Sequence, residues 1–186
     1  MSEVVREITF EIAPRGSKLF ATFPIREGRD RRPMQTDTPT VYVVDDDPAV
    51  RDALKSLLRS VGLSVVDFES ADAFSKAQRA SGPCCLVLDV RMPGQSGLDL
   101  QDELGAAGDH IPIILVTGHG DIPMSVRAMK AGAVEFLPKP FREQELLDAI
   151  HIALERDRRR LDLRLAEADL VKKFDSLSPR EREIMA

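Results

Sequence analysis

The stretch TVYVVDDDPAV, residues 40–50, decides the fold class. Its apolar run 41–44 is continuous rather than alternating, which is typical of a strand covered on both faces in a parallel sheet. A helix start follows at once, with Asp47 placed as N-cap and Pro48 at the first helical position. One face of this predicted helix carries the apolar residues Val50, Leu54, Leu57, Leu58 and Val61. Gly62 is placed to end the helix. A buried strand that leads directly into a one-sided helix is the repeating unit of α/β folds.

The same strand–helix unit recurs along the middle of the chain. Four further short apolar runs, several of them containing β-branched residues, predict strands at 64–68, 84–88, 113–116 and 133–137. The helical signals between and after them are the cap pair Ser96 and Asp99, the periodic residues Met124, Ala128 and Ala131 before Gly132, and the periodic residues Leu147, Ile150 and Leu154. Five strands that alternate with five helices predict a parallel α/β sheet with right-handed crossovers.

The composition narrows the class of protein. Hydrophobic residues make up 43% of the 186-residue chain, which is normal for a globular core and excludes a disordered or collagen-like chain. The net charge of -5 argues against a protein that binds nucleic acid over its whole surface. The two cysteines, Cys84 and Cys85, are adjacent in an apolar run and form neither a disulfide framework nor a four-ligand zinc site. Because we find no apolar stretch of membrane-spanning length and no signal peptide, we expect a cytoplasmic protein without membrane association.

Polar residues follow four of the predicted strands at the point where each strand ends. Asp45 and Asp46 follow the first strand, Asp89 ends the third, Thr117 ends the fourth and Lys139 follows the fifth. Ligands of open parallel sheets bind outside the carboxyl ends of the strands, so we expect these five side chains to meet at that edge. Three carboxylates a few ångströms apart repel one another by roughly 4 kcal/mol per pair at an effective dielectric constant of about 20. A divalent cation removes this cost, and hard oxygen ligands with spare water positions favour Mg²⁺.

The same set of groups is suited to holding a phosphoryl group. A carboxylate can attack phosphorus, while the cation, Thr117 and Lys139 stabilise the equatorial oxygens. Taken singly, each of these side chains is also explained as a helix cap, a turn residue or a solvated loop residue. Their joint placement at four strand ends favours the functional interpretation.

Four motifs at these strand ends resemble one known family. They are VVDDD at 43–47, LVLDVRMPGQSG at 86–97, VTGHGD at 116–121 and FLPKPF at 136–141. With them, residues 39–155 resemble the receiver domain of bacterial two-component response regulators. The resemblance implies a doubly wound, flavodoxin-like (CheY-like) sheet of five parallel strands in the order 2-1-3-4-5.

For the acidic residues the resemblance implies specific roles. Asp89 is expected to be the phosphoacceptor. Asp46 and Asp89, together with the backbone carbonyl of Arg91, are expected to bind Mg²⁺, and Asp45 is expected to hold the ion mainly through water. Mg²⁺ is therefore the expected cofactor.

The resemblance also implies how phosphorylation is sensed. Thr117 and Lys139 are expected to contact the phosphoryl oxygens, and Phe136 occupies the aromatic switch position. The family's mechanism implies that Thr117 moves toward the phosphoryl group and that Phe136 turns inward to fill the vacated space. It further implies a cis peptide bond between Lys139 and Pro140, an isomer that proline makes accessible.

The amino-acid sequence of residues 116–141, VTGHGDIPMSVRAMKAGAVEFLPKPF, resembles the FixJ-type branch of the family. That branch dimerises after phosphorylation through its fourth helix and fifth strand, which correspond here to residues 123–136. The implied partners are a sensor histidine kinase and a second copy of the chain. The implied function is phosphorylation-dependent regulation of transcription, not enzymatic turnover.

Two alternatives from other classes stay open. A phosphatase with an aspartate nucleophile, of the haloacid-dehalogenase type, keeps a second acid two residues after its nucleophile, where this chain has Arg91. A protein-interaction module that has lost phosphorylation is expected to lack an acid, the threonine or the lysine, and all are present. Turnover separates these hypotheses, because a switch retains its phosphate whereas a phosphatase consumes substrate continuously.

The two ends of the chain carry weaker signals. Helical spacing of Leu154, Leu161, Leu165 and Leu170 predicts that the fifth helix continues into a linker helix over 156–175. Within 176–186, LSPREREIM resembles the opening of a LuxR-type helix-turn-helix domain, which the chain leaves incomplete. We therefore expect DNA binding only through the missing part of that output domain. Residues 1–38 are expected to be an N-terminal extension, either unstructured or a remnant hairpin of a histidine-kinase ATPase domain.

Overall fold

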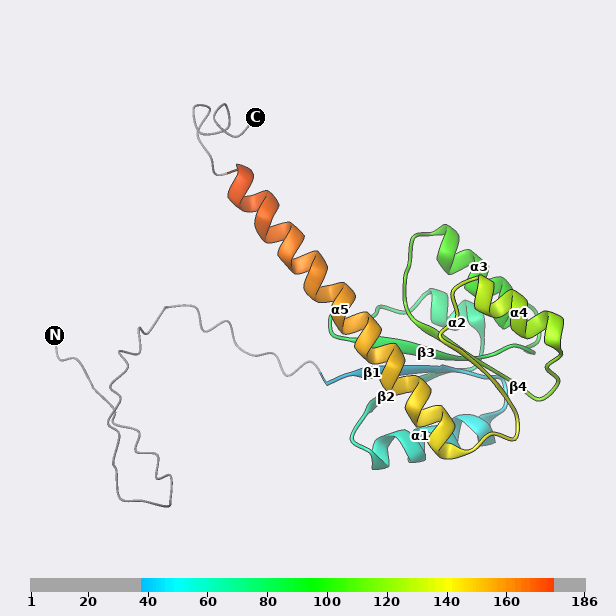
Figure 1. Cartoon of the computed structure of the whole chain (residues 1–186). Coiled ribbons are helices and arrows are strands. Elements are labelled where there is room, and N and C mark those ends of the chain that lie inside the picture. The colour runs from blue at the N-terminus through cyan, green and yellow to red at the C-terminus, as the bar shows by residue number, and fades with distance from the viewer. Residues whose placement is uncertain (1–37, 176–186) are drawn as a thin grey trace, which may run out of the picture. The chain divides into compact units, whose positions relative to one another are not determined.

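A computed structural model of the protein describes residues 38–175 (Figure 1). The predicted N-terminal extension, apart from Thr38, and the predicted start of a LuxR-type domain lie outside these residues. The elements along the chain are β1 (Thr40–Val44), α1 (Pro48–Ser60), β2 (Ser64–Phe68), α2 (Ala71–Ser75), β3 (Cys84–Asp89), α3 (Gly97–Ala106), β4 (Ile113–Thr117), α4 (Ile122–Lys130), β5 (Glu135–Pro138) and α5 (Glu143–Asp175). In this part of the chain no helix is both long and apolar enough to cross a membrane.

The five strands form one parallel sheet in the order β2-β1-β3-β4-β5. The chain adds β2 on one side of β1 and then returns to add β3 on the other side. The loops that follow β1 and β3 therefore lead to opposite faces of the sheet and leave a crevice between them at the carboxyl ends. This topology confirms the predicted doubly wound, CheY-like fold.

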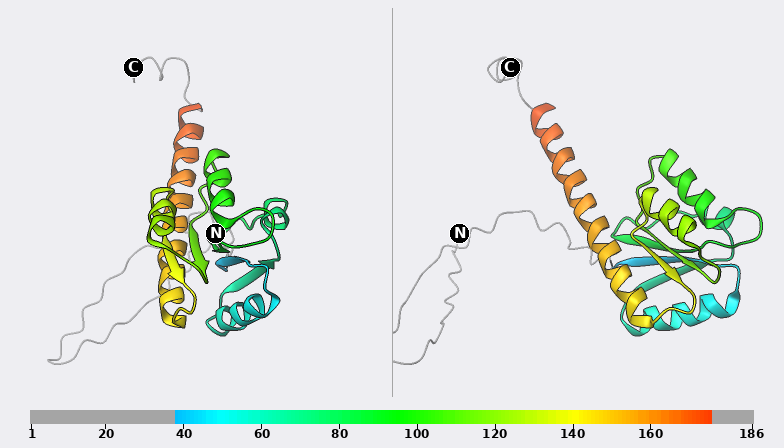
Figure 2. Two further views of the ribbon diagram at one scale, coloured as in Figure 1. Left: turned by 90° about the vertical axis from the view of Figure 1, so that its right-hand side faces the viewer. Right: turned by 45° about the vertical axis from the view of Figure 1, so that its right-hand side comes forward.

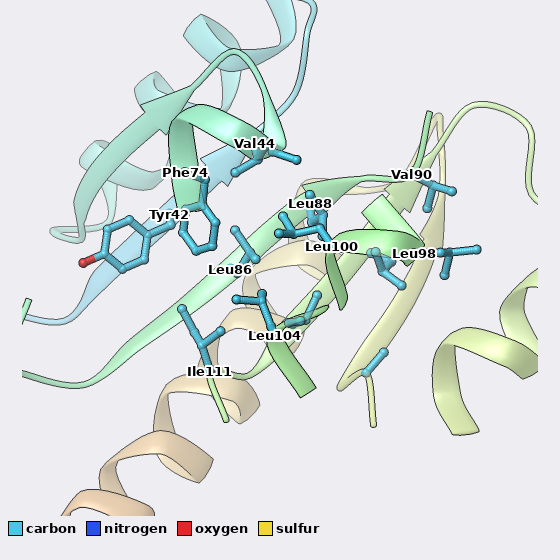
Figure 3. Packing of buried hydrophobic residues seen from close by; sticks show 14 of the residues in the cluster. Tyr42, Val44, Phe74, Leu86, Leu88, Val90, Leu98, Leu100, Leu104 and Ile111 are labelled. Atoms are coloured by element: carbon cyan, nitrogen blue, oxygen red, sulfur yellow. The ribbon is translucent and has the colours of Figure 1, made fainter. Parts of the chain in front are cut away.

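The continuous apolar runs of the strands supply both faces of the sheet, because successive side chains point to opposite sides. In β1, Val41 and Val43 pack with α1 and α5, whereas Tyr42 and Val44 pack with α2, α3 and α4. The right-hand view of Figure 2 shows the sheet between these two helical layers. Figure 3 shows the second of the two cores, in which Phe74 of α2 and Leu100 of α3 are almost completely buried. The helices thus bury the three central strands β1, β3 and β4 on both faces and leave the edge at the strand ends for polar groups.

The fifth strand begins later than the sequence pattern predicts. The apolar run 133–137 indicates a strand from Ala133, but β5 begins at Glu135. The backbone N–H of Ala133 donates to the carbonyl oxygen of Ala128, 3.1 Å away, and so belongs to the end of α4. Ala133 is buried in the turn after α4. Apolar periodicity alone does not distinguish such a buried turn residue from a strand residue.

Helix α5 runs without interruption from Glu143 to Asp175, which confirms the predicted extension of the fifth helix into a linker helix. Its first turns bury Leu146 and Ile150 against the sheet. Further along, the apolar side chains of Leu163 and Leu170 are each 66% exposed. The helix therefore changes from a core element to a solvated one along its length.

Helix α5 contains a buried acid that the sequence pattern does not indicate. The charged segment 156–160 looks like a solvated helix face, yet Asp157 is fully buried. Its Oδ2 accepts a hydrogen bond from the backbone N–H of Cys84 at 2.9 Å, and its Oδ1 accepts one from Nε of Arg160 at 2.8 Å. Asp157 thereby satisfies the first amide of β3 and ties α5 to the amino end of that strand.

Close packing at the other end of β3 depends on Gly97, the first residue of α3. Its N–H donates to the carbonyl oxygen of Val90 at 3.0 Å, and a Cβ at this position would overlap the backbone carbonyl oxygen of Asp89. Gly105 near the end of the same helix has open space where its Cβ would be. The two glycines therefore form a matched pair for substitution.

We predict that Gly97→Ala destabilises the chain by about 1–3 kcal/mol, because the added methyl group must displace backbone in a packed region. Gly105→Ala should stabilise it by up to about 1 kcal/mol, since alanine costs less backbone entropy in a helix than glycine. Urea unfolding of the two variants and the wild type measures both effects. Equal stabilities of the two variants would contradict the close approach of α3 to the end of β3.

Candidate functional site

The strand register brings the predicted site residues to one edge of the sheet. Asp45 follows β1 directly, Asp89 is the last residue of β3, Thr117 is the last residue of β4, and Lys139 follows β5. Neighbouring strands end at the same level, because Asp89 pairs with Val116 and Thr117 pairs with Pro138 in the sheet. The carboxyl ends of β1, β3, β4 and β5 therefore form the base of the candidate site.

Lys139 joins two buried carboxylates at this edge. Its Nζ lies 2.6 Å from Oδ2 of Asp45 and 2.7 Å from Oδ1 of Asp89. Only 2% of Asp45 and 5% of Asp89 is exposed, so both acids are almost completely desolvated. The contact between residues 45 and 139 spans 94 positions of sequence and exists only because β1 and β5 lie in the same sheet.

Backbone amides hold the second oxygen of each carboxylate. The N–H of Asp47 donates to Oδ1 of Asp45 at 3.0 Å, and the N–H of Arg91 donates to Oδ2 of Asp89 at 2.6 Å. Each carboxylate is thus held at one oxygen by its own loop and at the other by Lys139. This arrangement fixes the direction of both acids before any ligand arrives.

The charges of this cluster are only partly balanced. Burial by itself lowers the pKa of Lys139, but the hydrogen bonds and charges of Asp45 and Asp89 outweigh it and raise that pKa. Burial also raises the pKa of Asp89, and the neighbouring Asp45 adds to this effect; the hydrogen bond and charge of Lys139 oppose it without cancelling it. The pKa of Asp89 rises despite the ion pair mainly because burial removes water from its carboxylate, and the neighbouring charge of Asp45 adds a smaller contribution.

The predicted third acid lies apart from this ion cluster. Asp46 is exposed, and Lys139 pairs with Asp45 and Asp89 instead. Among residues 38–175, no three His, Cys, Asp or Glu side chains are gathered closely enough to hold a metal ion. In this conformation Asp46 does not join Asp45 and Asp89, and the binding of Mg²⁺ by all three acids stays a prediction. An exposed acid next to a loop backbone gains more from water than from a second buried carboxylate.

The donor set nevertheless fits a hard divalent cation. The acids offer carboxylate oxygens, which Mg²⁺ prefers, and the buried pair exceeds the charge of its single ammonium partner. The raised pKa of Asp89 shows that its desolvated negative charge is costly in this site, mainly through burial and to a smaller degree through the charge of Asp45. A cation that binds beside Asp89 and Asp46 would therefore be stabilised by charge that the protein leaves unpaired.

Thr117 and Phe136 adjoin the cluster without contacting its charges directly. Thr117 is fully buried, and its Oγ1 accepts a hydrogen bond from the N–H of His119 at 3.3 Å. Its carbonyl oxygen accepts the N–H of Lys139 at 2.7 Å, so the two residues are adjacent through the backbone. The half-buried ring of Phe136 packs over Gly120, in the space that a Cβ of Gly120 would fill.

The peptide bond between Lys139 and Pro140 is cis, as the motif predicts. Arg51 was not among the predicted site residues, yet its Nη1 donates to the backbone carbonyl oxygens of Asp45 and Asp46. A basic residue in the first turn of a helix carries no pattern that would mark such a contact.

The family of this chain follows from its similarity to known proteins. A model of the response regulator receiver domain matches residues 41–151, which contain every residue of the ion cluster. The chain belongs to the response regulator receiver family. The predicted identity of the central domain is thereby confirmed.

Several relatives of this receiver chain belong to the FixJ-type branch or resemble it. Nodulation protein W of Bradyrhizobium diazoefficiens is 57% identical over 145 residues, which cover 78% of this chain and 64% of that protein. Response regulator protein TodT of Pseudomonas putida is 49% identical over 154 residues, which cover 83% of this chain and 68% of TodT. The transcriptional regulatory protein FixJ of Azorhizobium caulinodans is 45% identical over 145 residues, covering 78% of this chain and 69% of FixJ. The chain thus spans about two thirds of the length of these relatives.

Solved structures agree with this placement. The low-resolution structure of response regulator StyR matches with a TM-score of 0.74 and 53% identity, and it covers 79% of this receiver chain and 74% of StyR. The crystal structure of FixJ-N matches with a TM-score of 0.56 and 43% identity over 62% of this chain and 93% of that one. The predicted FixJ-type assignment is therefore confirmed at the level of sequence relatives and fold.

The partly balanced cluster leads to a prediction about stability. Asp89→Asn should stabilise the receiver by about 1 kcal/mol at neutral pH without divalent cations, because it removes a desolvated charge that repels Asp45. The amide oxygen can still accept a hydrogen bond from Lys139, but the amide NH₂ group cannot accept the N–H of Arg91, and this loss limits the gain. Since the pKa of Asp89 is raised by folding, its ionisation weakens the fold at pH values above that pKa, and the penalty disappears as the pH falls. The gain should therefore shrink as the pH falls through the raised pKa of Asp89 toward the ordinary carboxyl pKa of about 4.

Urea unfolding at several pH values measures this difference, and Asp67→Asn provides the control. Asp67 lies 3.3 Å from Nε of Arg51 and 3.2 Å from Nζ of Lys55, so its removal leaves two cations without this partner. We expect Asp67→Asn to lower the stability by up to about 1 kcal/mol. A loss of stability in Asp89→Asn as large as in Asp67→Asn would refute the excess of negative charge at the site.

Proposed function

We propose that this chain is the phosphorylation-controlled receiver of a two-component system, with Asp89 as the acceptor of the phosphoryl group. The supporting observation is the bridge from Lys139 to the two buried acids Asp45 and Asp89. A carboxylate that is oriented by its loop amide and paired with a half-buried ammonium is suited both to attack phosphorus and to tolerate the added charge. The donor is a phosphohistidine of a sensor histidine kinase, as in the family to which the chain belongs.

In the transfer, an oxygen of Asp89 forms a bond to phosphorus while the bond from phosphorus to the donor nitrogen breaks, and the imidazole leaves with the electron pair. Lys139 neutralises charge on the phosphoryl oxygens, and Thr117 contacts them with its hydroxyl group. Asp46, Asp89 and the backbone carbonyl of Arg91 would hold Mg²⁺, with Asp45 acting mainly through water. When bound, this ion would screen the repulsion between the acids and the incoming phosphate.

The conformational change after phosphorylation takes place in β4, α4 and β5. Phosphorylation adds close to two negative charges near Thr117, and we infer that Thr117 shifts toward them while Phe136 turns further inward. Helix α4 presents the exposed apolar residues Ile122, Val126 and Met129 along one face. We propose that this face, within residues 123–136 and the adjacent turn, forms a homodimer after phosphorylation.

The organisation of the chain follows from this function. We propose a receiver over residues 39–155, a linker helix over 156–175 and, from 176, the start of a DNA-binding output domain. In this proposal the receiver is a regulator of transcription rather than an enzyme, and DNA is bound only by the output domain. Two relatives carry names of this kind, since FixJ is called a transcriptional regulatory protein and TodT a response regulator.

The acceptor assignment is tested with acetyl phosphate and Mg²⁺. We expect the wild-type chain to gain the mass of one phosphoryl group and Asp89→Asn to gain none, because an amide does not attack phosphorus. Asp148→Asn, a change of the same kind at an exposed position of α5, should be phosphorylated like the wild type. Intact-mass spectrometry over time measures all three chains.

Two outcomes would reject this function. Phosphate on Asp89→Asn would place the acceptor elsewhere. Continuous consumption of acetyl phosphate at the rate expected of a phosphatase, without a lasting gain of mass, would favour the enzyme with an aspartate nucleophile.

The dimer face is tested by placing a charge in it. Val126 on α4 is 45% exposed and Val61 at the end of α1 is 50% exposed, so both accept an aspartate at similar cost to folding. We expect Val126→Asp to be phosphorylated normally but to stay monomeric, because the new charge would be buried in the interface. Val61→Asp should dimerise like the wild type, and light scattering after phosphorylation measures the difference. Dimerisation of Val126→Asp at wild-type concentrations would exclude this face.

A further inference from the structure

Arg51 lies in the first turn of α1 and contacts the loop that carries the acidic pair. Its Nη1 donates to the backbone carbonyl oxygen of Asp45 at 2.8 Å and to that of Asp46 at 3.0 Å. Its Nε lies 3.3 Å from Oδ2 of Asp67 in β2, and the side chain of Arg51 is only 15% exposed. One guanidinium therefore joins the loop after β1 to the neighbouring strand.

We propose that Arg51 is a positioning residue that holds the β1–α1 loop in the conformation in which Asp46 and Asp45 receive a divalent cation beside Asp89. The inference rests on the proposed function, because it assigns Arg51 to the cation site of that function. Arg51 acts through the loop backbone and does not itself contact the cation or the phosphoryl group.

The two carbonyl contacts define the orientation of Asp46. The carbonyl of Asp45 lies in the peptide plane before the Cα of Asp46, and the carbonyl of Asp46 lies in the plane after it. Because peptide units are planar, holding both carbonyl oxygens fixes the backbone on either side of this residue. The direction in which the exposed Asp46 side chain leaves the loop is thereby restricted, although that side chain makes no ion pair with Lys139.

The other hydrogen bonds at the start of this loop involve its amides rather than the carbonyl oxygens that Arg51 binds. The N–H of Asp45 donates to the carbonyl oxygen of Phe68 at 3.2 Å, and the N–H of Asp47 is bound by the Asp45 side chain. These bonds fix amides of the loop, whereas Arg51 fixes its carbonyls. Side chains of a helix lean toward its N-terminus, so a long residue in the first turn of α1 reaches back over the loop.

The charge of Arg51 is balanced on the side away from the site. An unpaired guanidinium behind the acidic loop would weaken cation binding by repulsion. Here Asp67 faces Arg51, and Lys55 lies 3.2 Å from Asp67 and 2.9 Å from Asp52. Two basic and two acidic side chains thus balance one another, and the acidic pair keeps its negative charge for a cation.

The contact requires the shape of arginine as well as its charge. A guanidinium offers N–H donors on several edges in a rigid plane, so it can serve two carbonyls and a carboxylate at once. A lysine ammonium at this position keeps the charge but has no such fork. Arg51→Lys therefore tests the effect of losing the hydrogen bonds to the loop while the positive charge is kept. Lys55→Gln is the matched control. Lys55 also contacts Asp67, but its ammonium binds the side chains of Asp52 and Asp67 and not the loop carbonyls.

The experiment measures Mg²⁺ binding to the full chain by titration calorimetry and the Mg²⁺ concentration that half-saturates phosphorylation by acetyl phosphate. We expect Arg51→Lys and Arg51→Gln to bind Mg²⁺ about tenfold more weakly than the wild type, the usual effect of losing an outer support of a metal site. Their maximal phosphorylation at saturating Mg²⁺ should return to the wild-type level. Lys55→Gln should stay within about twofold of the wild type, because a partly exposed ion pair contributes little.

A merely structural role of Arg51 would lower stability without this selective rescue by Mg²⁺. Urea unfolding without divalent cations confirms that each variant is folded, and the charge-conserving Arg51→Lys carries the test if Arg51→Gln unfolds. Wild-type Mg²⁺ affinity in Arg51→Lys, or an equal loss in Lys55→Gln, would overturn the inference while leaving the proposed function intact. Failure of the wild-type chain itself to bind Mg²⁺ would overturn both.

Discussion

The organisation of this protein depends on two carboxylates that are buried beside a single ammonium. Asp45 and Asp89 are almost completely desolvated, and Lys139 bridges them at 2.6 and 2.7 Å. Such a cluster is tolerable only when each oxygen has a partner, and here the loop amides after β1 and β3 supply the remaining bonds. The excess of negative charge is a cost to the fold and, in the proposed function, the source of affinity for a cation.

The strand β3 connects this cluster to the rest of the molecule at both of its ends. Asp89 closes the strand at the site, and the close approach of Gly97 sets the distance between α3 and that end. At the opposite end, the buried carboxylate of Asp157 holds the first amide of the strand and links it to α5. The linker helix is therefore attached to the same strand that carries the proposed acceptor.

The sequence patterns predicted the strands and the helix caps correctly, for identifiable reasons, and the structure brings Asp45, Asp89 and Lys139 together at one edge of the sheet as expected. Continuous apolar runs and the Asp47–Pro48 helix start are local signals, and the structure confirms Asp47 as the N-cap of α1. The start of β5 was predicted two residues too early, because a buried turn residue and a strand residue are equally apolar. The separation of Asp46 from the ion cluster, the burial of Asp157 and the contacts of Arg51 were not predictable, since each depends on a partner distant in space or on the direction of a side chain.

The amino-acid sequence by itself determined that this chain forms alternating strands and helices and that acids, a threonine and a lysine stand at the strand ends. Those features are encoded in the spacing of neighbouring residues. Only the tertiary structure decided which of these groups are desolvated together, which oxygens Lys139 contacts, and that a guanidinium of α1 holds the loop of the acidic pair. Interactions of this kind depend on distance and desolvation, and these arise only when segments as far apart as residues 45 and 139 are packed into one sheet.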